Sequence, residues 1–482
     1  MTEEKTDLKR GLSFFDCTAI VMRSMIGSGI FIVSAAISRT LGSPGWLLVS
    51  WLFAGLITIM AALSYSELAS MYPQAGGQYI YLREACGKLP AFLYGWTLFC
   101  IIQTGTIAAV CVGFAKFTGV IFPCISSSHW ICNIGVLPGM RLLGKYDIGL
   151  NTENLLAIII IIFLTWINTC GLTFGKLVQN VFTTTKVVAL IGLILLGFLI
   201  GRNMNAISTN FQNIWDSSFT LAGAVHELPL LGVAMVGSLF SCDAWNNITF
   251  TAGEVINPKK NIPLSLAFGT GAVILLYVLV NVVYLCVLPM HGSINGSDIF
   301  SRGIQFAKDD RVGTAVMQMI FGDYGSVLMA MLIMVSTFGC ANGIILSGAR
   351  VYYAMAKDNL FFKIAGTTNS RAVPQAALIM QGIWTSLLCI SGTYSDLLDY
   401  VIFAVLLFYI LTIAGLFILR KTKPDIERPY KAFGYPIIPA LYIFFALAIS
   451  IDLLIYKPLY TWPGLVIVLA GIPVYHLWQR KD

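Results

Sequence analysis

Long apolar stretches recur along the whole chain and are separated by polar segments. A helix needs roughly 20 apolar residues to cross a hydrocarbon core of about 30 Å, and stretches of this length occur about twelve times. The sequence lacks the short alternating strands of a transmembrane barrel. We therefore expect an all-α integral membrane protein, with helices at about 14–36, 45–69, 90–122, 153–170, 178–200, 229–252, 263–289, 325–348, 374–391, 397–419, 437–456 and 461–478.

The segments between these helices are short, except for three of about 123–152, 289–324 and 349–373. None of them is long enough for a soluble domain of useful size. Function must therefore reside in the membrane part. A helix broken at mid-membrane exposes backbone groups that lipid cannot satisfy, so breaks persist only around cavities.

The first apolar stretch contains two glycines separated by a serine, Gly27-Ser28-Gly29, near its middle. Glycine permits the backbone to unwind at this depth. The alternative interpretation is a close contact between helices, which small residues commonly provide in membrane bundles.

The sixth apolar stretch is polar at mid-depth, between Phe240 and Asn247. Asp243 in this segment would be costly if it faced lipid. The first and sixth stretches are five spans apart, which is the relation expected of corresponding elements in a pair of inverted five-helix repeats. This pattern is typical of a secondary transporter.

An unwound helix offers free N–H groups from the half that begins and free carbonyls from the half that ends, which suits a zwitterion. We expect amides near Ser28, Gly29 and Ile30 to bind an α-carboxylate. Carbonyls near Ile26 and Phe240 would then bind the α-ammonium group. The candidate substrate-binding residues are Ile26, Ser28, Gly29, Ile30, Phe240, Ser241, Asp243 and Asn246.

Three charged residues lie within apolar stretches and have competing interpretations. Lys186 either occupies the place of a coupling sodium ion, carries a transported proton, or snorkels to the inner surface. Asp243 either contacts the substrate or neutralises Lys186 or Arg23. Arg23, which receives no site role, either snorkels or pairs with one of three acids, Asp16, Glu67 or Glu254. Phe240 and Trp245 either cover the site or serve packing alone.

Composition supports a lipid environment, since 57% of residues are hydrophobic and only 11% are charged, against about 25% charged in soluble domains. Lys and Arg are retained on the cytoplasmic side of short loops. Their distribution places both termini of a plasma-membrane protein in the cytoplasm. The net charge of +7 mostly reflects this bias, so nucleic-acid binding is not expected. The polar residues 1–10 lack the pattern of a cleavable signal peptide.

Other classes of function receive little support. The 11 cysteines include no Cys-x-x-Cys pair, so we expect no metal site. The four histidines have no metal or triad spacing, which disfavours a membrane enzyme. A channel would need a pore lined by repeated carbonyls or rings of charge, whereas the pattern indicates one asymmetric cavity.

These residues resemble the amino acid, polyamine and organocation superfamily and, within it, the L-type amino acid transporter family. The run Ile26–Phe31 is similar to that family's first-helix break. Further matching segments follow in the same order over almost the whole chain: Tyr65-Ser66-Glu67-Leu68 with Pro73, Gly76, Gly77, Tyr79 and Tyr81; Gly253-Glu254 with Asn257-Pro258 and Asn261-Ile262-Pro263-Leu264; Lys423–Pro429; and Gly471–Tyr475.

The resemblance implies a LeuT-like 5+5 inverted repeat with broken helices 1 and 6, alternating access, sodium-independent exchange of amino acids and no cofactor. Lys186 matches the fifth-helix lysine that stands where sodium-coupled relatives hold an ion. Phe240 matches an aromatic gate, and Asn246 a polar residue beside the substrate. Phe408 and Tyr409 lie near the aromatics around the substrate side chain. The implied units are the N-terminus (1–13), the first repeat (14–200), the second repeat (229–420) and two added helices (437–478).

Two residues depart from the pattern of the L-type family. Arg23 stands where members usually have a small residue, and Asp243 resembles the subset that handles cationic as well as neutral amino acids. Animal members pair with a single-span glycoprotein through an outer-loop cysteine near the position of Cys124. Cys132 lies in the same loop, so an internal disulfide and two free thiols are open alternatives. We prefer a carrier without this partner. Proton-coupled symport stays an alternative to exchange, because Lys186 serves either by staying charged or by titrating.

Overall fold

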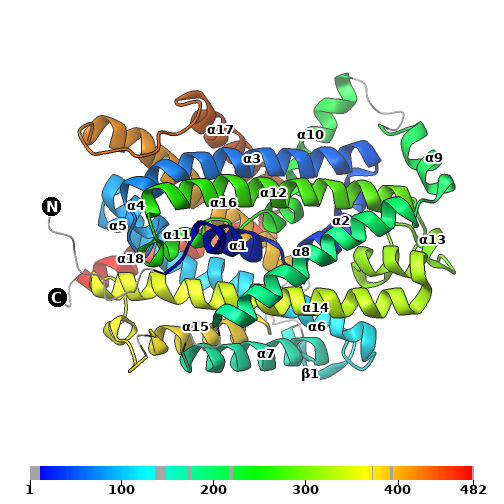
Figure 1. The fold of residues 1–482 in the computed structure, drawn as a ribbon, viewed down its shortest axis with the longest axis horizontal. Coiled ribbons are helices and arrows are strands. Elements are labelled where there is room, and N and C mark those ends of the chain that lie inside the picture. Colours follow the sequence, from blue (N-terminus) through cyan, green and yellow to red (C-terminus); the bar gives the residue numbers. More distant parts are fainter. Residues whose placement is uncertain are drawn as a thin grey trace.

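A computed structural model describes residues 11–135, 148–171, 175–215, 221–371, 373–390 and 394–479. Long helices dominate and run side by side, as Figure 1 shows. The first half contains α1 (Phe14–Met25), α2 (Gly29–Leu41), α3 (Pro44–Met71), α4 (Gln78–Cys86), α5 (Lys88–Thr97), a π-helical turn (Leu98–Ile102), α6 (Gln103–Ile121), α7 (Thr152–Thr169), α8 (Gly175–Leu199) and α9 (Met204–Gln212). The second half contains α10 (Leu221–Ser241), α11 (Asn247–Phe250), α12 (Pro258–Val287), α13 (Ile299–Arg302), α14 (Val312–Lys357), α15 (Gln375–Leu388), α16 (Tyr394–Thr422), α17 (Ile437–Tyr456) and α18 (Pro458–Gln479).

The first predicted span is broken, as the glycine pattern predicts. Helix α1 begins at a capping box in which Ser13 and Asp16 bond each other's backbone. It ends at Ile26, whose ψ of 92° is extended. Helix α2 starts after Ser28, and the two axes differ by 41°.

The sixth predicted span is broken as well. Helix α10 ends at Ser241, and the short α11 begins only at Asn247. Between them Ala244 adopts a left-handed backbone conformation with φ of 62°. This conformation is sterically unfavourable for a residue with a Cβ, so the surrounding contacts must stabilise the break.

Eight helices of the described residues are long and apolar enough to cross a membrane, and up to ten spans result if each bent pair counts as one. The all-α membrane fold is therefore confirmed, while the number of twelve spans stays a prediction. Two predicted spans fall short of the length criterion: α15 has 14 residues, and the apolar part of α10 covers Leu228–Ser241.

Two predicted loops contain regular structure. The segment after the third span forms an antiparallel hairpin of β1 (Trp130–Gly135) and β2 (Ile148–Asn151), so the chain is not purely helical. Helix α14 begins at Val312, well before the predicted 325, and contains a kink at Phe321 and Gly322. The predicted start was late because this first part precedes the long apolar run.

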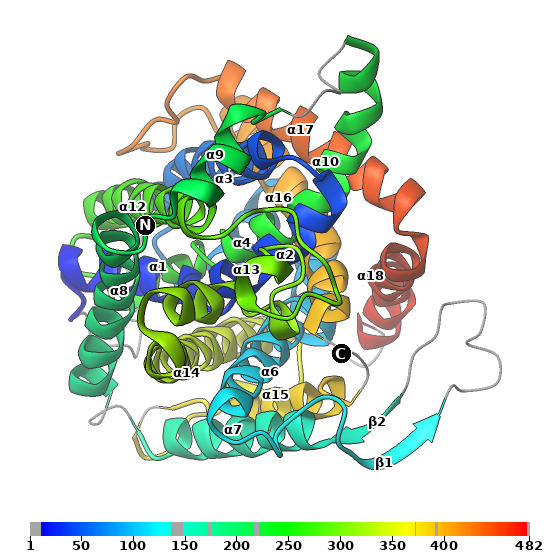
Figure 2. The same ribbon diagram turned by 90° about the vertical axis from the view of Figure 1, so that its right-hand side faces the viewer.

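The broken first span lies in the middle of the bundle. Helix α1 packs against α8, α12 and α14, and α2 packs against α10 and α14. Figure 2, which looks along the long helices, shows α2 near the centre and α7, α18 and the β hairpin at the periphery. Both breaks are therefore enclosed by protein, as irregular backbone in a membrane requires.

Candidate functional site

The two breaks touch at Gly29 and Ser241. A Cβ placed on Gly29 would lie 2.2 Å from the Ser241 Oγ and 3.1 Å from the Ser241 Cβ. Only glycine allows the helices to approach so closely. At Gly27 a Cβ would meet Cys340 Sγ at 3.6 Å, which is an ordinary contact. The two interpretations of this glycine pair therefore coexist, because the backbone unwinds and a close helix contact forms beside it.

Lys186 is bound to the first break. Its Nζ donates to the carbonyl oxygens of Arg23 at 2.9 Å and of Ile26 at 2.8 Å, and its side chain is 1% exposed. The ammonium group thus lies at the end of α1 rather than at the inner surface, where the snorkelling interpretation would put it. The ammonium group satisfies two carbonyl oxygens at the end of α1 that have no donor within the helix.

Side chains from two further helices bond to backbone carbonyls around the break. On α12, the Tyr277 hydroxyl donates to the Met25 carbonyl at 2.9 Å, and the Tyr284 hydroxyl donates to the Ile30 carbonyl at 3.2 Å. On α14, Cys340 donates to the Ser24 carbonyl at 3.3 Å. The end of α1 and the start of α2 are therefore stabilised by side-chain donors. These donors replace the backbone hydrogen bonds that the break removes from the helix.

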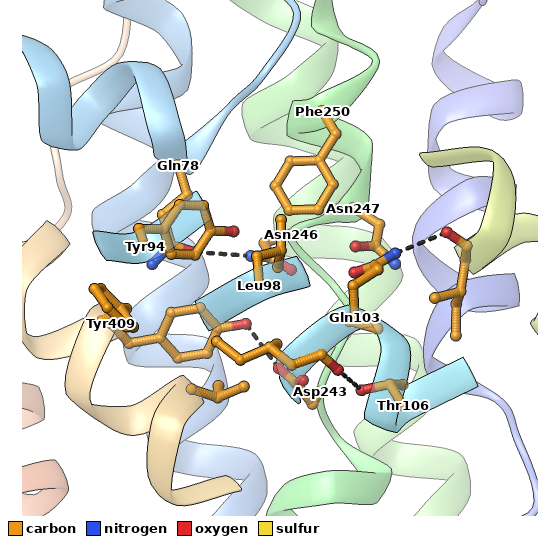
Figure 3. A pocket seen from close by; sticks show the side chains of 15 residues that line it. Gln78, Tyr94, Leu98, Gln103, Thr106, Asp243, Asn246, Asn247, Phe250 and Tyr409 are labelled. Carbon is orange, nitrogen blue, oxygen red and sulfur yellow. Dashed lines mark hydrogen bonds between the residues drawn. The ribbon is translucent and has the colours of Figure 1, made fainter. Parts of the chain in front are cut away.

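A small cavity adjoins the second break (Figure 3). Its walls come from α4, α5, the π-helical turn, α6, the α10–α11 break, α14 and α16. Two predicted site residues, Asp243 and Asn246, line this cavity, and so do Phe408 and Tyr409. The lining does not include the other predicted residues Ile26, Ser28, Gly29, Ile30, Phe240 and Ser241. The predicted site is thus divided between the closed contact of the breaks and a polar cavity next to it.

Asp243 is 9% exposed and accepts a 2.7 Å hydrogen bond at Oδ1 from the Tyr409 hydroxyl. In the described part of the chain it forms no ion pair with Lys186 or Arg23. The interpretation in which Asp243 neutralises these cations therefore finds no contact that supports it. Its carboxylate instead belongs to the cavity wall, beside the phenol of α16.

Amide side chains form the rest of the polar wall. Asn246 donates to the Gln78 Oε1 at 3.2 Å, and Gln78 donates to the Thr412 hydroxyl at 3.0 Å, which links α11, α4 and α16. Gln103 donates to the Ile344 carbonyl at 2.7 Å. These bonds fix three of the amides in place.

Asn247 differs from the other amides. Its side chain is 3% exposed and lines the cavity, yet its Nδ2 has no hydrogen-bond partner among the described residues. A buried donor without a partner is costly and indicates a ligand. The sequence reasoning missed Asn247, Gln78, Gln103 and Tyr94. Of these, Gln103 was detectable as a polar residue within the third apolar stretch.

Trp245 lies in an aromatic cluster rather than over the cavity. Its ring centroid is 4.9 Å from Tyr65 and 5.4 Å from Tyr409, and its side chain is 1% exposed. These distances are typical of packed aromatic pairs. Phe240 is buried at the end of α10. The packing interpretation therefore fits Trp245.

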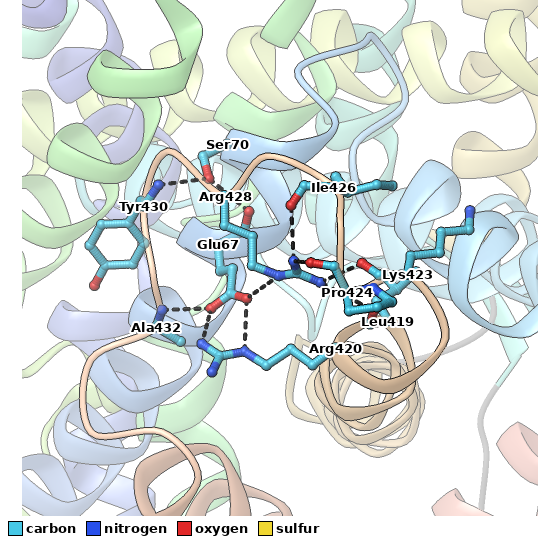
Figure 4. A network of polar contacts seen from close by, with 10 residues as sticks. All are labelled: Glu67, Ser70, Leu419, Arg420, Lys423, Pro424, Ile426, Arg428, Tyr430 and Ala432. Atoms are coloured by element: carbon cyan, nitrogen blue, oxygen red, sulfur yellow. Dashed lines mark hydrogen bonds and ion pairs between the residues drawn. The ribbon is translucent and has the colours of Figure 1, made fainter.

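One end of the bundle is closed by ion pairs. Glu67 is fully buried and accepts from Arg420 at 2.9 and 2.6 Å and from the Ala432 N–H at 2.6 Å, as Figure 4 shows. Arg428 lies 3.3 Å from the same carboxylate. Nearby, the hydrogen bond from Lys423 to Glu84 raises the pKa of Lys423. This network pins the segment after α16 to α3.

The same end explains why Arg23 lacks its predicted partners. Glu254 pairs with Arg350 at 2.6 Å, Glu67 pairs with Arg420, and Asp16 is bound to Ser13. The prediction that one of these acids pairs with Arg23 is wrong. The three acids stabilise other contacts of the inner end.

A larger cavity lies at the other end, between α2, α10 and α16. Ion pairs border it, since Arg39 meets Asp310 at 2.7 Å and Lys457 meets Asp399 at 2.8 Å. The Cys124 and Cys132 thiols are exposed and free. Ion pairs thus lie at both ends of the bundle, and this cavity lies at the end opposite Glu67.

Comparison with known proteins agrees with this architecture. A family model described as amino acid permease matches residues 12–472. The b(0,+)-type amino acid transporter 1 of Mus musculus is 28% identical over 480 residues, which cover 99% of this chain and 90% of that protein. The large neutral amino acids transporter small subunit 2 of Homo sapiens is 28% identical over 489 residues, which cover 98% and 82%. The predicted resemblance is confirmed: this chain is a membrane transport protein, not an enzyme, and belongs to the amino acid permease family.

Proposed function

We propose that this protein exchanges amino acids across the plasma membrane by alternating access, without sodium, and with both termini in the cytoplasm. The observation that carries the proposal is the contact of two broken helices at Gly29 and Ser241 beside a cavity lined by Asp243 and Asn246. Two such breaks supply free backbone donors and acceptors in a place that lipid cannot reach.

The amino acid backbone binds at the breaks. Amides at the start of α2, from Ser28 to Ile30, take the α-carboxylate, because the first N–H groups of a helix have no partner within it. Carbonyls near Ile26 and Phe240 take the α-ammonium group. The Ile26 carbonyl already accepts from Lys186 and the Phe240 carbonyl from the Asp243 N–H, so the two carbonyls share the ammonium group through their remaining lone pairs.

The substrate side chain is directed into the small cavity at the second break. Tyr94, Phe408 and Tyr409 offer aromatic faces to an apolar side chain, and Asp243 offers a carboxylate to a cationic one. We therefore propose neutral and also cationic amino acids as substrates. The large neutral amino acids transporter among the relatives is named for the first class.

Lys186 determines whether amino acid transport is coupled to sodium, to protons or to exchange. Its ammonium group bonds to two carbonyls at the first break and takes the place of a sodium ion, which makes sodium unnecessary. Proton-coupled symport requires Lys186 to release its proton during each cycle. Two short bonds to carbonyls favour the charged form, so exchange is the preferred mode.

Proteoliposome flux tests this proposal. Purified protein is reconstituted without sodium, and uptake of labelled leucine is measured with and without unlabelled leucine inside. We expect strong stimulation by internal leucine and little response to a pH gradient. Accumulation driven by the pH gradient alone would replace exchange with symport, and no uptake of any amino acid would overturn the proposal.

The Cys124 thiol is exposed on the outer side in the proposed topology and is the group that a single-span glycoprotein would use for a disulfide. We propose that transport does not depend on such a partner. A Cys124→Ser variant expressed alone should then transport at the wild-type rate. A loss of transport together with a lost disulfide-linked complex on a non-reducing gel would identify an obligatory partner.

A further inference from the structure

Arg23 is a buried cation without an anion. It lies on α1 one turn before the break and is 6% exposed. Its Nε is buried and has no hydrogen-bond partner within the ranges that the structure describes, and no ion pair to its guanidinium is found there. Removing a charge from water is costly unless a partner compensates it, so this position calls for an explanation.

The surroundings of Arg23 add positive charge. Lys186 donates to the backbone carbonyl of Arg23 itself, and its ammonium group acts on Arg23 as a like charge. On α14, Arg350 is a further like charge for Arg23. Arg350 is paired with Glu254, whereas neither Arg23 on α1 nor Lys186 on α8 forms an ion pair with any described residue. The inner half of the first broken span therefore has an excess of positive charge.

Arg23 also packs against α14. On α14, a Cβ on Gly343 would lie 3.1 Å from the Arg23 Nε, so the guanidinium is wedged between α1 and α14. A snorkelling arginine would extend to the inner surface and be exposed at its tip. This one stays within the bundle, on the side of the break that faces the end closed by the ion pairs of Glu67 and Glu254.

We propose that Arg23 is the anion-binding residue of the inner half of the transport path, where it binds a small carboxylate or halide when α1 separates from α14. A guanidinium is suited to this task because its planar fork binds a carboxylate with two parallel hydrogen bonds. The inference rests on the proposed function in one respect, since one source of the carboxylate is the transported amino acid on its way to or from the cytoplasm. The other source is an inorganic anion such as chloride.

Transport kinetics measured separately from each side test this inference. Wild type, Arg23→Gln and Arg23→Lys are compared in inside-out and right-side-out vesicles. Losing a charge-assisted hydrogen bond should raise the cytoplasmic-side KM roughly tenfold in Arg23→Gln. The outer-side KM should stay within about twofold, because Arg23 lies behind the site. Arg23→Lys should recover part of the cytoplasmic affinity, which a purely structural role would not predict.

Replacing chloride by the bulky sulfonate isethionate on the cytoplasmic side distinguishes the two sources. If the wild-type KM is unchanged and Arg23→Gln still raises it, the anion is the amino acid carboxylate. If wild-type transport falls without chloride and Arg23→Gln no longer responds to chloride, the anion is inorganic. Unchanged cytoplasmic kinetics in Arg23→Gln under both conditions overturn the inference.

A measurement on purified protein separates this inference from the proposed function. The melting temperature of the wild type is compared in chloride, acetate and isethionate, and the same series is repeated with Arg23→Gln. We expect chloride or acetate to raise the melting temperature of the wild type only. If the wild type transports no amino acid, the proposed function fails. If the melting temperatures of both proteins shift equally, the inference about Arg23 fails, whatever the result for transport. Arg23→Gln is expected to fold, because it removes an uncompensated buried charge.

Discussion

The two breaks of this transporter both interrupt a membrane helix, but a cation lies at the first and a carboxylate at the second. At the first break, cationic Lys186 and neutral hydroxyls donate to the exposed carbonyls of α1, and glycine allows the close approach to α10. At the second break, acidic Asp243 and a row of amides face a cavity. The first break is thus built from backbone groups, which every amino acid can satisfy, and the second from side chains, which discriminate.

The largest effect is expected from Gly29→Ala, which disrupts the close contact between the two breaks. The added methyl group would lie 2.2 Å from Ser241 Oγ, so the helices must separate or Ser241 must turn. Such overpacking should lower transport of every substrate roughly a hundredfold. The measurement is exchange of leucine and lysine at matched surface expression.

Gly27→Ala is the matched control, since its new methyl group makes only an ordinary contact at 3.6 Å. The double variant Gly29→Ala with Ser241→Ala should recover part of the activity, because the nearest clash is removed. Wild-type exchange in Gly29→Ala would show that the breaks do not have to approach this closely.

The next largest effect is expected from Lys186→Met. It removes the donor from the carbonyls of Arg23 and Ile26, and leaving such buried acceptors without a partner should lower exchange roughly thirtyfold. The melting temperature should fall as well. Val188→Ala on the same helix is a control, because its side chain is 60% exposed. Wild-type exchange in Lys186→Met would show that the first break does not need the Lys186 ammonium group.

Much of this comparison could be predicted from the sequence. Glycine, lysine and aspartate stand out inside apolar stretches, so both breaks and the positions of Lys186 and Asp243 were visible. The hydrogen-bond partners of Lys186 and Asp243 could not be predicted. The bond from Lys186 to Ile26 joins residues 160 positions apart, and the missing partner of Asn247 depends on every side chain around it.

The remaining differences have similar causes. The π-helical turn Leu98–Ile102 lies within an uninterrupted apolar stretch, so periodicity gives no sign of it. The proposed pairing of Arg23 failed because the three acids bind partners closer to them in space. Pairing of charges is a tertiary property, and a sequence without an alignment does not reveal it.

A smaller and more selective effect is expected from Asp243→Asn. Lysine exchange should fall roughly tenfold and leucine exchange should stay within about twofold, because only the cationic side chain loses its counter-charge. Tyr409→Phe is the control: it removes the 2.7 Å hydrogen bond but keeps the carboxylate, so the ratio of lysine to leucine exchange should hardly change. Equal losses for both substrates in Asp243→Asn would assign Asp243 a structural role.

The smallest effect is expected from Asn247→Ala. Its Nδ2 has no hydrogen-bond partner among the described residues, so the variant should keep its melting temperature while the KM for glutamine rises roughly threefold relative to leucine. Asn168→Ala is the opposite case, because Asn168 donates to Asn342 at 2.7 Å and does not line the cavity. The Asn168→Ala variant should have a lower melting temperature, and its ratio of KM for glutamine to KM for leucine should not change. The reverse pattern would contradict the assignment of Asn247 to the substrate side chain.

The most direct test of the division between the two breaks is an experimental structure with bound lysine. The carboxylate oxygens are expected within about 2.7–3.2 Å of the N–H groups at Ser28 to Ile30, with the side-chain ammonium directed into the cavity at Asp243. A lysine bound in the opposite direction, or bound away from both breaks, would contradict the proposal that one break reads the backbone and the other the side chain.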